Sequence, residues 1–132
     1  HSFQLLTALS QLETKGILHL DIKPDNILYD EANRVCKLTD FGTSLEMGEV
    51  EQGKEYVSRY YRAPEVFLGG QLGHGVDIWS MACTFFEMFC GEFLFAGKND
   101  PHMLDLFLVT RGKLSLKYLK KCLVRSRNHI ES

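Results

Sequence analysis

The chain opens with apolar residues at near-helical spacing. They are Phe3, Leu5, Leu6, Leu9 and Leu12. Recurrence at intervals of three and four residues is typical of one face of an amphipathic helix. Lys15 then places a basic group in the last turn, and Gly16 tolerates the left-handed conformation that often ends a helix. The pattern therefore predicts a helix that ends just before residue 17.

Three short apolar runs follow, at residues 17–18, 27–29 and 35–38, and each is typical of a strand. The polar turn at residues 30–33 separates the last two runs, which predicts a hairpin. This hairpin would bring the loop before residue 27 close to the loop after residue 38. The polar side chains of those two loops are therefore expected to lie together, on loops braced by strands.

A polar stretch runs from Gly42 to Tyr56 and contains two further glycines and four glutamates. This composition is typical of a mobile loop. Ser44 and Tyr56 carry hydroxyls on the loop, and we expect both of them to be exposed to solvent.

The second half of the chain predicts helices. Residues 77–90 are apolar almost all round, which indicates a helix that is buried on most of its faces. Gly91 would end this helix, and residues 97–101 would form a turn. Residues 103–109 would open another helix, whose leucine and phenylalanine side chains pack rather than bind a cofactor. We therefore expect an α+β fold that is mainly α-helical, with short β-hairpins.

Three motifs carry the candidate chemistry. They are HLDIKPDN at residues 19–26, DFG at residues 40–42 and APE at residues 63–65. Taken singly, each has an ordinary structural explanation: DFG as a turn, His19 as a core histidine, and Asp77 as a helix cap. Their joint occurrence in this order indicates a phosphoryl-transfer site.

The residue types fit the transfer of a phosphoryl group from ATP to a hydroxyl. Asp21 can orient the hydroxyl and accept its proton, and Lys23 can neutralise the charge that builds on the phosphate. Asn26 and Asp40 offer the hard oxygen atoms that Mg²⁺ prefers. We therefore expect ATP and Mg²⁺ as cofactors, with Lys23, Asn26 and Asp40 at the cofactor site and the last two as metal ligands.

With these motifs the sequence resembles the eukaryotic protein kinases over nearly its whole length. Lys23, two residues after Asp21, resembles the serine/threonine-specific branch. In similar kinases a residue equivalent to Ser58 hydrogen-bonds the catalytic aspartate and lysine. The segment SRYYRAPE at residues 58–65 resembles the CMGC group. Four segments are most similar to the splicing-associated kinases named for pre-mRNA processing factor four: residues 21–28, 57–59, 75–80 and 97–104.

The resemblance implies the C-terminal lobe of a kinase domain, with short β-hairpins around the catalytic loop. In similar kinases the aspartate equivalent to Asp77 binds backbone amides of that loop. The resemblance also implies protein substrates with serine or threonine, spliceosomal proteins as partners, and a nuclear rather than cytoplasmic location. It gives structural or regulatory positions to His19, Glu55, Ser58, Arg59, Arg62, Glu65 and Asp77.

Two departures from the family pattern affect the expected regulation. Leu20 stands where similar kinases commonly carry an arginine that helps to bind a phosphate on the activation segment. Glu55, four residues before Arg59, stands where several relatives carry a phosphorylated tyrosine. We expect the Glu55 carboxylate to pair with Arg59 or Arg62, and activity to depend less on phosphorylation.

The resemblance also predicts that residues 1–132 are a partial kinase domain, truncated at both ends. The sequence shows no Gly-rich loop, strand lysine or helix glutamate, which together form the upper half of an ATP clamp. It also shows no arginine segment of the kind that pairs with the glutamate equivalent to Glu65. We expect the isolated chain to expose apolar surface and to have little or no kinase activity.

Two other functions remain open. Small-molecule phosphotransferases have a similar catalytic loop, but the segments at residues 63–65 and 77–80 favour a platform for peptide substrates. A pseudokinase or truncated scaffold would bind proteins without catalysis. The intact set of Asp21, Lys23, Asn26 and Asp40 weighs against a decayed site. Binding of magnesium-ATP would separate the kinase from the scaffold.

Composition limits the partners. The 132 residues are 45% hydrophobic with a net charge of −2, so the whole chain is a folded piece rather than a nucleic-acid-binding polycation. Residues 111–132 hold seven basic residues against Glu131, which we interpret as a solvated helix face rather than a docking surface. We expect no direct nucleic-acid binding and no membrane span. The cysteines lack zinc-site spacing and are expected to be buried thiols: Cys36, Cys83, Cys90 and Cys122.

Overall fold

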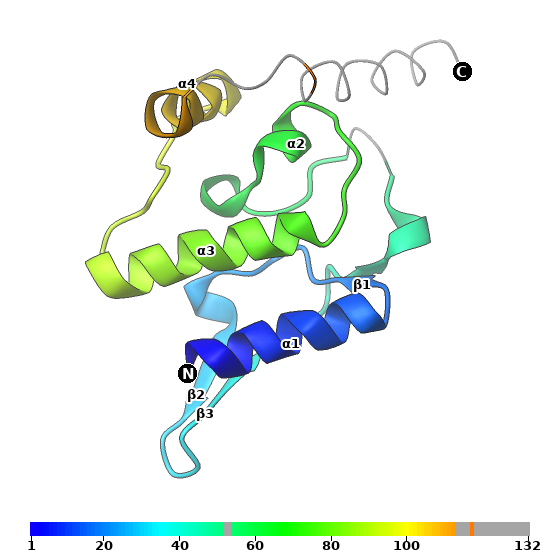
Figure 1. Cartoon of the computed structure of the whole chain (residues 1–132), viewed down its shortest axis with the longest axis vertical. Helices are drawn as coiled ribbons and strands as arrows, with labels where there is room; N and C mark the ends of the chain where they lie inside the picture. The colour runs from blue at the N-terminus through cyan, green and yellow to red at the C-terminus, as the bar shows by residue number, and fades with distance from the viewer. Residues whose placement is uncertain (52–53, 113–116, 118–132) are drawn as a thin grey trace.

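The computed structural model describes the chain except for residues 52–53, 113–116 and 118–132. It has four α-helices and two antiparallel strand pairs in its described part, which confirms a mainly helical α+β fold (Figure 1). The elements in chain order are α1 (Ser2–Thr14), β1 (Ile17–Leu18), β2 (Ile27–Asp30), β3 (Val35–Leu38), β4 (Leu45–Glu46), α2 (Pro64–Phe67), α3 (Gly75–Cys90) and α4 (Asp100–Arg111). Short 3₁₀ turns lie at Pro24–Asn26, Met47–Glu49 and Arg59–Tyr61.

Helix α1 ends where the sequence predicts. Lys15 is its C-cap, and Gly16 has a φ of 67°, the left-handed conformation for which glycine is favoured. Leu5 and Leu9 of the apolar stripe are buried, whereas Phe3 is exposed. The stripe therefore packs α1 against the rest of the protein mainly through its central turns.

The predicted hairpin is present. Strands β2 and β3 pair antiparallel, with Ile27 opposite Leu38 at the end nearest the polar loops. Strand β1 pairs with β4, whose two residues lie inside the stretch that the composition predicts to be a loop. Leu45 and Glu46 do not form an apolar run, so the sequence does not indicate a strand there, and the pairing with β1 creates it.

The hydroxyls predicted to be exposed on this stretch are instead engaged. The Tyr56 ring is buried against Leu18, Leu20 and Val76, and its hydroxyl accepts a hydrogen bond from the Glu51 amide at 3.0 Å. The Ser44 hydroxyl donates to the carbonyl oxygen of His19 at 3.2 Å. The prediction fails because the Tyr56 hydroxyl finds a partner within its own segment and the Ser44 hydroxyl finds one in the catalytic loop, and the local sequence reveals neither contact.

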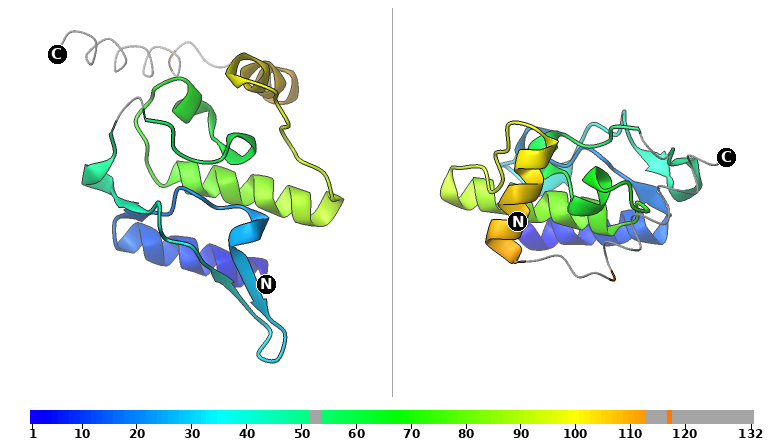
Figure 2. Two further views of the ribbon diagram at one scale, coloured as in Figure 1. Left: turned by 180° about the vertical axis from the view of Figure 1, so that it is seen from behind. Right: turned by 90° about the horizontal axis from the view of Figure 1, so that it is seen from above.

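Helix α3 contributes a buried residue to each of three apolar clusters. Met81 belongs to the cluster that contains Leu5 and Leu9 of α1, Cys83 to the cluster with Phe107 of α4, and Val76 to the one around Tyr56. In the views of Figures 1 and 2, α1 lies on one side of α3, while α2 and α4 lie on the other.

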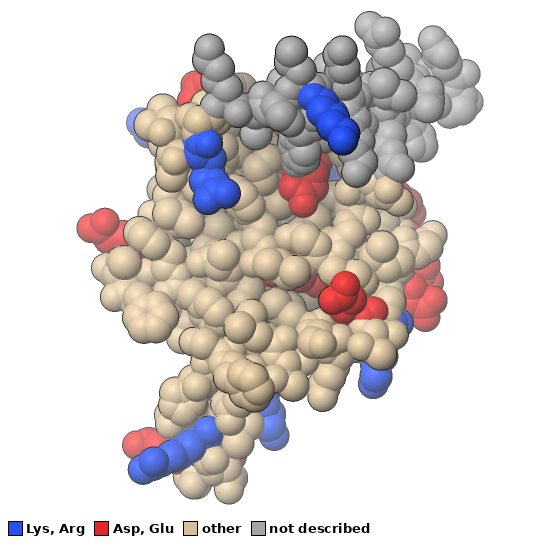
Figure 3. Space-filling view, in the orientation of Figure 1, with Lys and Arg blue, Asp and Glu red and all other residues tan. Residues whose placement is uncertain are grey.

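Burial of α3 is less complete than its composition predicts. Its first ten residues hold all of its buried positions, but Ile78 is exposed there, and Met88 and Phe89 are exposed near its end, Phe89 at 82%. Figure 3 shows a broad uncharged expanse across the face that α1 and α3 present. Among the described residues, the elements that pack on α3 from two sides leave an exposed stripe that contains Ile78, Phe86 and Phe89. Gly91 ends the helix with a φ of 74°, as predicted.

Of the cysteines predicted to be buried, the described ones are not all buried. Cys36 and Cys83 are buried, and burial raises the pKa of the Cys83 thiol to about 12. Cys90, in the last turn of α3, is exposed, so the prediction is wrong there. Cys122 and nearly all of the basic segment at residues 111–132 lie outside the described residues.

Helix α4 begins three residues before the expected start. Asn99 caps it, with its side chain accepting a hydrogen bond from the His102 amide at 2.9 Å, and Pro101 sits in the first turn, where no amide donor is needed. Met103 and Phe107 are buried, as a packing role requires. Within the described part of the chain, no helix has the length and apolar character needed to cross a membrane.

Candidate active site

The catalytic loop is tied to the start of α3 by Asp77. The Asp77 carboxylate accepts hydrogen bonds from the His19 amide at 2.7 Å and the Leu20 amide at 3.0 Å, which confirms the predicted contact. Asp77 is only 3% exposed. Burial raises the pKa of its carboxyl, and the two amide hydrogen bonds act in the opposite direction. These bonds hold Leu20 at a φ of 67°, a conformation that a leucine adopts only under constraint.

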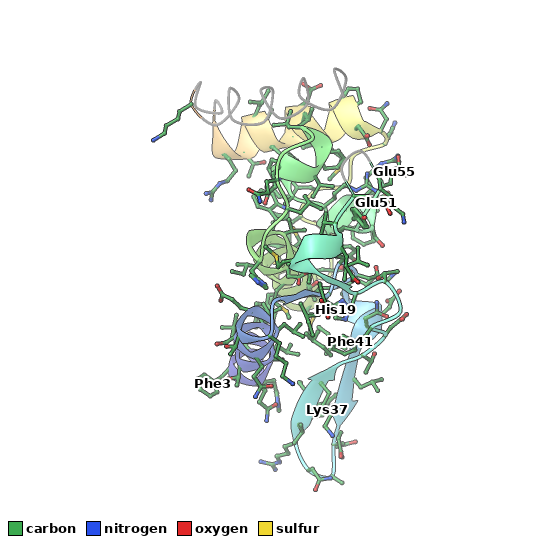
Figure 4. All side chains as sticks on the ribbon, turned by 90° about the vertical axis from the view of Figure 1, so that its right-hand side faces the viewer. Phe3, His19, Lys37, Phe41, Glu51 and Glu55 are labelled. Carbon is green, nitrogen blue, oxygen red and sulfur yellow. The ribbon has the colours of Figure 1, made fainter. Side chains whose placement is uncertain are left out.

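His19 links the catalytic loop to the DFG segment. Its Nδ1 accepts a hydrogen bond from the Asp21 amide at 3.2 Å, so the proton lies on Nε2, which donates to the Thr39 carbonyl at 2.9 Å. The ring also meets the Phe41 ring edge-on, with 4.8 Å between the ring centres (Figure 4). A fully buried imidazole thus aligns the backbone on both sides of the site.

Asn26 closes the catalytic loop back onto Asp21. Its amide nitrogen donates to the Asp21 carbonyl oxygen at 2.8 Å and to Oδ2 of the Asp21 carboxylate at 2.9 Å. The 3₁₀ turn that Pro24 begins makes this contact possible over a five-residue separation. The Thr39 amide donates to the Asn26 carbonyl at 2.9 Å, so the hairpin register places the DFG segment beside the loop.

The other Asp21 oxygen faces Ser58 and Lys23. The Ser58 hydroxyl donates to Asp21 Oδ1 at 3.2 Å, and Lys23 Nζ lies 3.6 Å from the same oxygen and 3.5 Å from the Ser58 hydroxyl. The carboxylate is therefore oriented from both sides by neutral donors and has one cation beside it. The contacts expected of Ser58 from the family resemblance are present.

Asp40 lies at the exposed edge of this cluster. Its backbone φ of 57° is left-handed, and Oδ1 accepts the Gly42 amide at 3.3 Å. A Cβ atom at position 42 would lie 3.2 Å from the same oxygen, so glycine leaves room for this turn. Among the described residues, the Asp40 carboxylate makes no ion pair.

The donor set fits magnesium. No group of three or more histidine, cysteine or acidic side chains could hold a metal ion among the described residues. Mg²⁺ is commonly bound by one or two protein oxygens together with substrate phosphates and water. The Asp40 carboxylate and the Asn26 side chain meet that requirement, provided that a nucleotide supplies the remaining oxygens.

Two arginines hold the segment at residues 57–62, which directly precedes the APE motif. Arg62 donates two hydrogen bonds to the Val57 carbonyl, at 3.0 Å from Nε and 2.8 Å from Nη2. Arg59 and Arg62 both face Asp100 at the start of α4, at 3.5 and 3.9 Å. The prediction that Glu55 pairs with one of them is therefore wrong: Glu55 is exposed and lies away from His19, on the outer side of its loop (Figure 4).

Sequence reasoning missed a second hydrogen-bonded pair beneath this segment. The Tyr61 hydroxyl donates to the Glu87 carboxylate of α3, and the Ser80 hydroxyl donates to the Tyr61 carbonyl at 2.7 Å. Burial and the neighbouring Glu87 raise the Tyr61 pKa above its usual value. The APE motif follows directly, with Ala63 fully buried and Glu65 half-buried in the first turn of α2.

Comparison with known proteins identifies the family. Residues 2–126 match the protein kinase domain. The chain is 47% identical over 118 residues to serine/threonine-protein kinase prpf4B of Dictyostelium discoideum, which covers 89% of this chain and 14% of the relative. It is 37% identical over 121 residues to serine/threonine-protein kinase prp4 of Schizosaccharomyces pombe, covering 92% of this chain and 25% of the relative. It is 42% identical over 123 residues to glycogen synthase kinase 3 of Trypanosoma brucei brucei, covering 90% and 35%. The chain thus spans a minor part of each relative, and it belongs to the protein kinase domain family.

Proposed function

We propose that the protein is a serine/threonine protein kinase that transfers the γ-phosphoryl group of ATP to hydroxyls of other proteins. The observation that carries this proposal is the arrangement around Asp21. Asn26 donates to one oxygen of its carboxylate, and Ser58 and Lys23 lie at the other. Such an orientation suits a base that accepts a proton from one direction.

Each residue of this cluster has a distinct role in the proposed reaction. Asp21 accepts the proton of the attacking hydroxyl, and Lys23 neutralises charge on the transferring phosphoryl group. Asn26 and Asp40 would hold Mg²⁺, which supplies positive charge against the phosphates when it is bound. Ser58 keeps Asp21 and Lys23 in place, and His19 and Asp77 fix the backbone that carries them.

The substrates proposed are serine and threonine side chains of spliceosomal proteins, with the protein in the nucleus. This finer proposal rests on the resemblance of the sequence to the splicing-associated kinases, together with the similarity to prpf4B and prp4. Direct binding to nucleic acid or to a membrane is not part of the proposed function.

Phosphoryl transfer by the longest natural protein that contains these residues, called the full-length protein below, tests the proposal. With magnesium and ATP labelled at the γ position, we expect the label to appear on serine and threonine of a protein substrate. Replacing Asp21→Asn should lower turnover by at least about 100-fold, because the general base is lost. Asp105→Asn is the matched control, since Asp105 is exposed and makes no ion pair with another described residue.

Nucleotide binding separates the kinase from the scaffold. The full-length protein should bind magnesium-ATP, and the Asp40→Asn variant should bind it more weakly when magnesium is the cation. A full-length protein that neither binds ATP nor transfers phosphate would contradict the proposal and favour a protein-binding scaffold. The isolated 132 residues are predicted to show little or no transfer, and robust transfer by them would contradict that expectation.

A further inference from the structure

Asp100 joins α4 to the segment that precedes the APE motif. Its Oδ1 lies 3.5 Å from Nε of Arg59 and 3.9 Å from Nη1 of Arg62. That oxygen is shielded from solvent and accepts no hydrogen bond from a described residue, although the side chain as a whole is 49% exposed. Arg59 Nη1 also donates to the Lys98 carbonyl at 3.2 Å, so two points near the start of α4 hold the same guanidinium.

Arg62 passes this connection to the backbone. Nη1 faces Asp100, whereas Nε and Nη2 both donate to the Val57 carbonyl. The guanidinium also lies over the Phe67 ring, 5.2 Å from its centre. The nitrogens of a planar guanidinium cannot move independently of one another. A contact that fixes one nitrogen of Arg62 therefore also fixes the direction of its other hydrogen bonds. The position of Asp100 therefore influences where the Val57 carbonyl is held.

Val57 needs such support. Its φ of 69° is left-handed, and a β-branched residue adopts that conformation only where its surroundings enforce it. The next residue is Ser58, whose hydroxyl donates to Asp21 Oδ1 at 3.2 Å and accepts from Lys23 at 3.5 Å. A loss of support at Val57 would shift Ser58 and with it the orientation of Asp21 and Lys23.

We propose that Asp100 is a positioning residue for phosphoryl transfer, which acts through Arg62 and Val57 on Ser58. This inference rests on the proposed kinase function. It goes beyond that function by assigning to a carboxylate of α4 the ordering of the segment that carries Ser58. The Asp100 carboxylate thereby supplies the negative charge between the Arg59 and Arg62 guanidinium groups.

A simpler role for Asp100 has to be separated from this one. Asp100 lies in the first turn of α4, where a negative charge also stabilises the helix dipole. If Asp100 only stabilised α4, its replacement would lower the free energy of unfolding without a specific effect on the turn Arg59–Tyr61. The hydrogen bond from the Tyr61 amide to the Ser58 carbonyl, 3.0 Å long, reports on that turn directly.

The test uses three single variants of the full-length protein. Asp100→Asn removes the charge at constant size, Asp100→Glu restores a carboxylate, and Asp105→Asn removes a charge from the exposed side of the same helix. We expect Asp100→Asn to lower kcat about three- to tenfold with little change in the KM for ATP, because the ion pairs are partly exposed. Asp100→Glu should recover most of kcat, and Asp105→Asn should leave it unchanged.

Hydrogen exchange makes the inference testable without activity. Exchange of the Tyr61 amide should be several times faster in Asp100→Asn than in the unmodified protein, and unchanged in Asp105→Asn. Adding Asp100→Asn to Arg62→Gln should cause less than the sum of the two single effects, as expected for groups in direct contact on the proposed route. Unchanged kcat and unchanged Tyr61 exchange in Asp100→Asn would overturn the inference even if the kinase function is correct. A protein that transfers no phosphate but shows the faster exchange would contradict the function and leave the structural coupling intact.

Discussion

Two carboxylates at the starts of two helices support the site, and they do so differently. Asp77 of α3 is buried and accepts two backbone amides at 2.7 and 3.0 Å. Asp100 of α4 is half exposed and faces two long side chains at 3.5 and 3.9 Å. Short bonds to backbone in a buried place fix geometry strongly, whereas longer ion pairs between partly exposed side chains are weaker and are screened by salt. The catalytic loop is therefore held more rigidly than the segment that carries Ser58.

Each carboxylate supports one residue with an unfavourable backbone conformation. Leu20 has a φ of 67° beside the bonds from Asp77, and Val57 has a φ of 69° beside the bonds from Arg62. Such residues cost on the order of 1–3 kcal/mol each and persist only where the surroundings hold them. The comparison predicts that the first site tolerates loss of its support far less well than the second.

The largest effect is expected from Asp77→Ala. Two buried amides would lose their acceptor, at about 1–3 kcal/mol each, so the kinase domain should lose about 2–6 kcal/mol of unfolding free energy. Urea unfolding of the domain measures this, and phosphate transfer should fall with it. Asp77→Asn keeps one acceptor and should cost less. A loss below about 1 kcal/mol for Asp77→Ala would show that the catalytic loop does not depend on this bond.

Gly97→Ala tests the placement of α4 itself. A Cβ atom at position 97 would lie 2.6 Å from Cγ and Sδ of Met103 and 2.8 Å from its backbone nitrogen. Such overpacking typically lowers the free energy of unfolding by about 1–3 kcal/mol, so we expect Gly97→Ala to unfold at a lower urea concentration. Gly48→Ala is the control, because nothing lies within 4 Å of its Cβ position. Equal stability of the two variants would mean that α4 shifts freely.

Ser58→Ala tests the point where the two supports meet. Loss of one hydrogen bond to the Asp21 carboxylate is worth about 1 kcal/mol, which corresponds to an about fivefold lower kcat. Ser58→Thr keeps a hydroxyl and should retain most of the activity. If Ser58→Ala left the kcat of the full-length protein unchanged, Asp100 could not act through Ser58.

A smaller effect is expected from salt, which should weaken the contacts of Asp100 more than those of Asp77. Screening at about 1 M salt acts over roughly 3 Å and weakens exposed ion pairs, so the kcat difference caused by Asp100→Asn should shrink there. The stability loss caused by Asp77→Ala should change little, because its bonds are buried. Urea unfolding and kcat, each at low and high salt, measure the two differences. Equal salt dependence in both would contradict the distinction.

Much of the catalytic loop could be predicted from the sequence, because its residues are close along the chain. Asp21 and Asn26 are five residues apart, and short motifs record such spacing. The Asp77 and Ser58 contacts span longer separations, and they were predicted because the family resemblance supplied them. Helix α1 and the β2–β3 hairpin followed from periodicity and turn composition.

The support at Asp100 could not be predicted in the same way. Arg59 and Asp100 are 41 positions apart in the sequence, and their meeting depends on how α4 packs against α2 and α3. Glu55 was the nearer acidic residue and therefore the wrong choice. The exposure of Phe89 was missed for a related reason: composition indicates that a helix is apolar but does not identify which side is covered.

The position of α3 among the three apolar clusters has a consequence for cooperativity. Val76, Met81 and Cys83 each belong to a different cluster, so no cluster can come apart without exposing part of the same helix. Local opening is favourable only where few buried contacts are lost. The first half of α3 should therefore open only in global unfolding, while its last turn, with Phe89 exposed, frays independently.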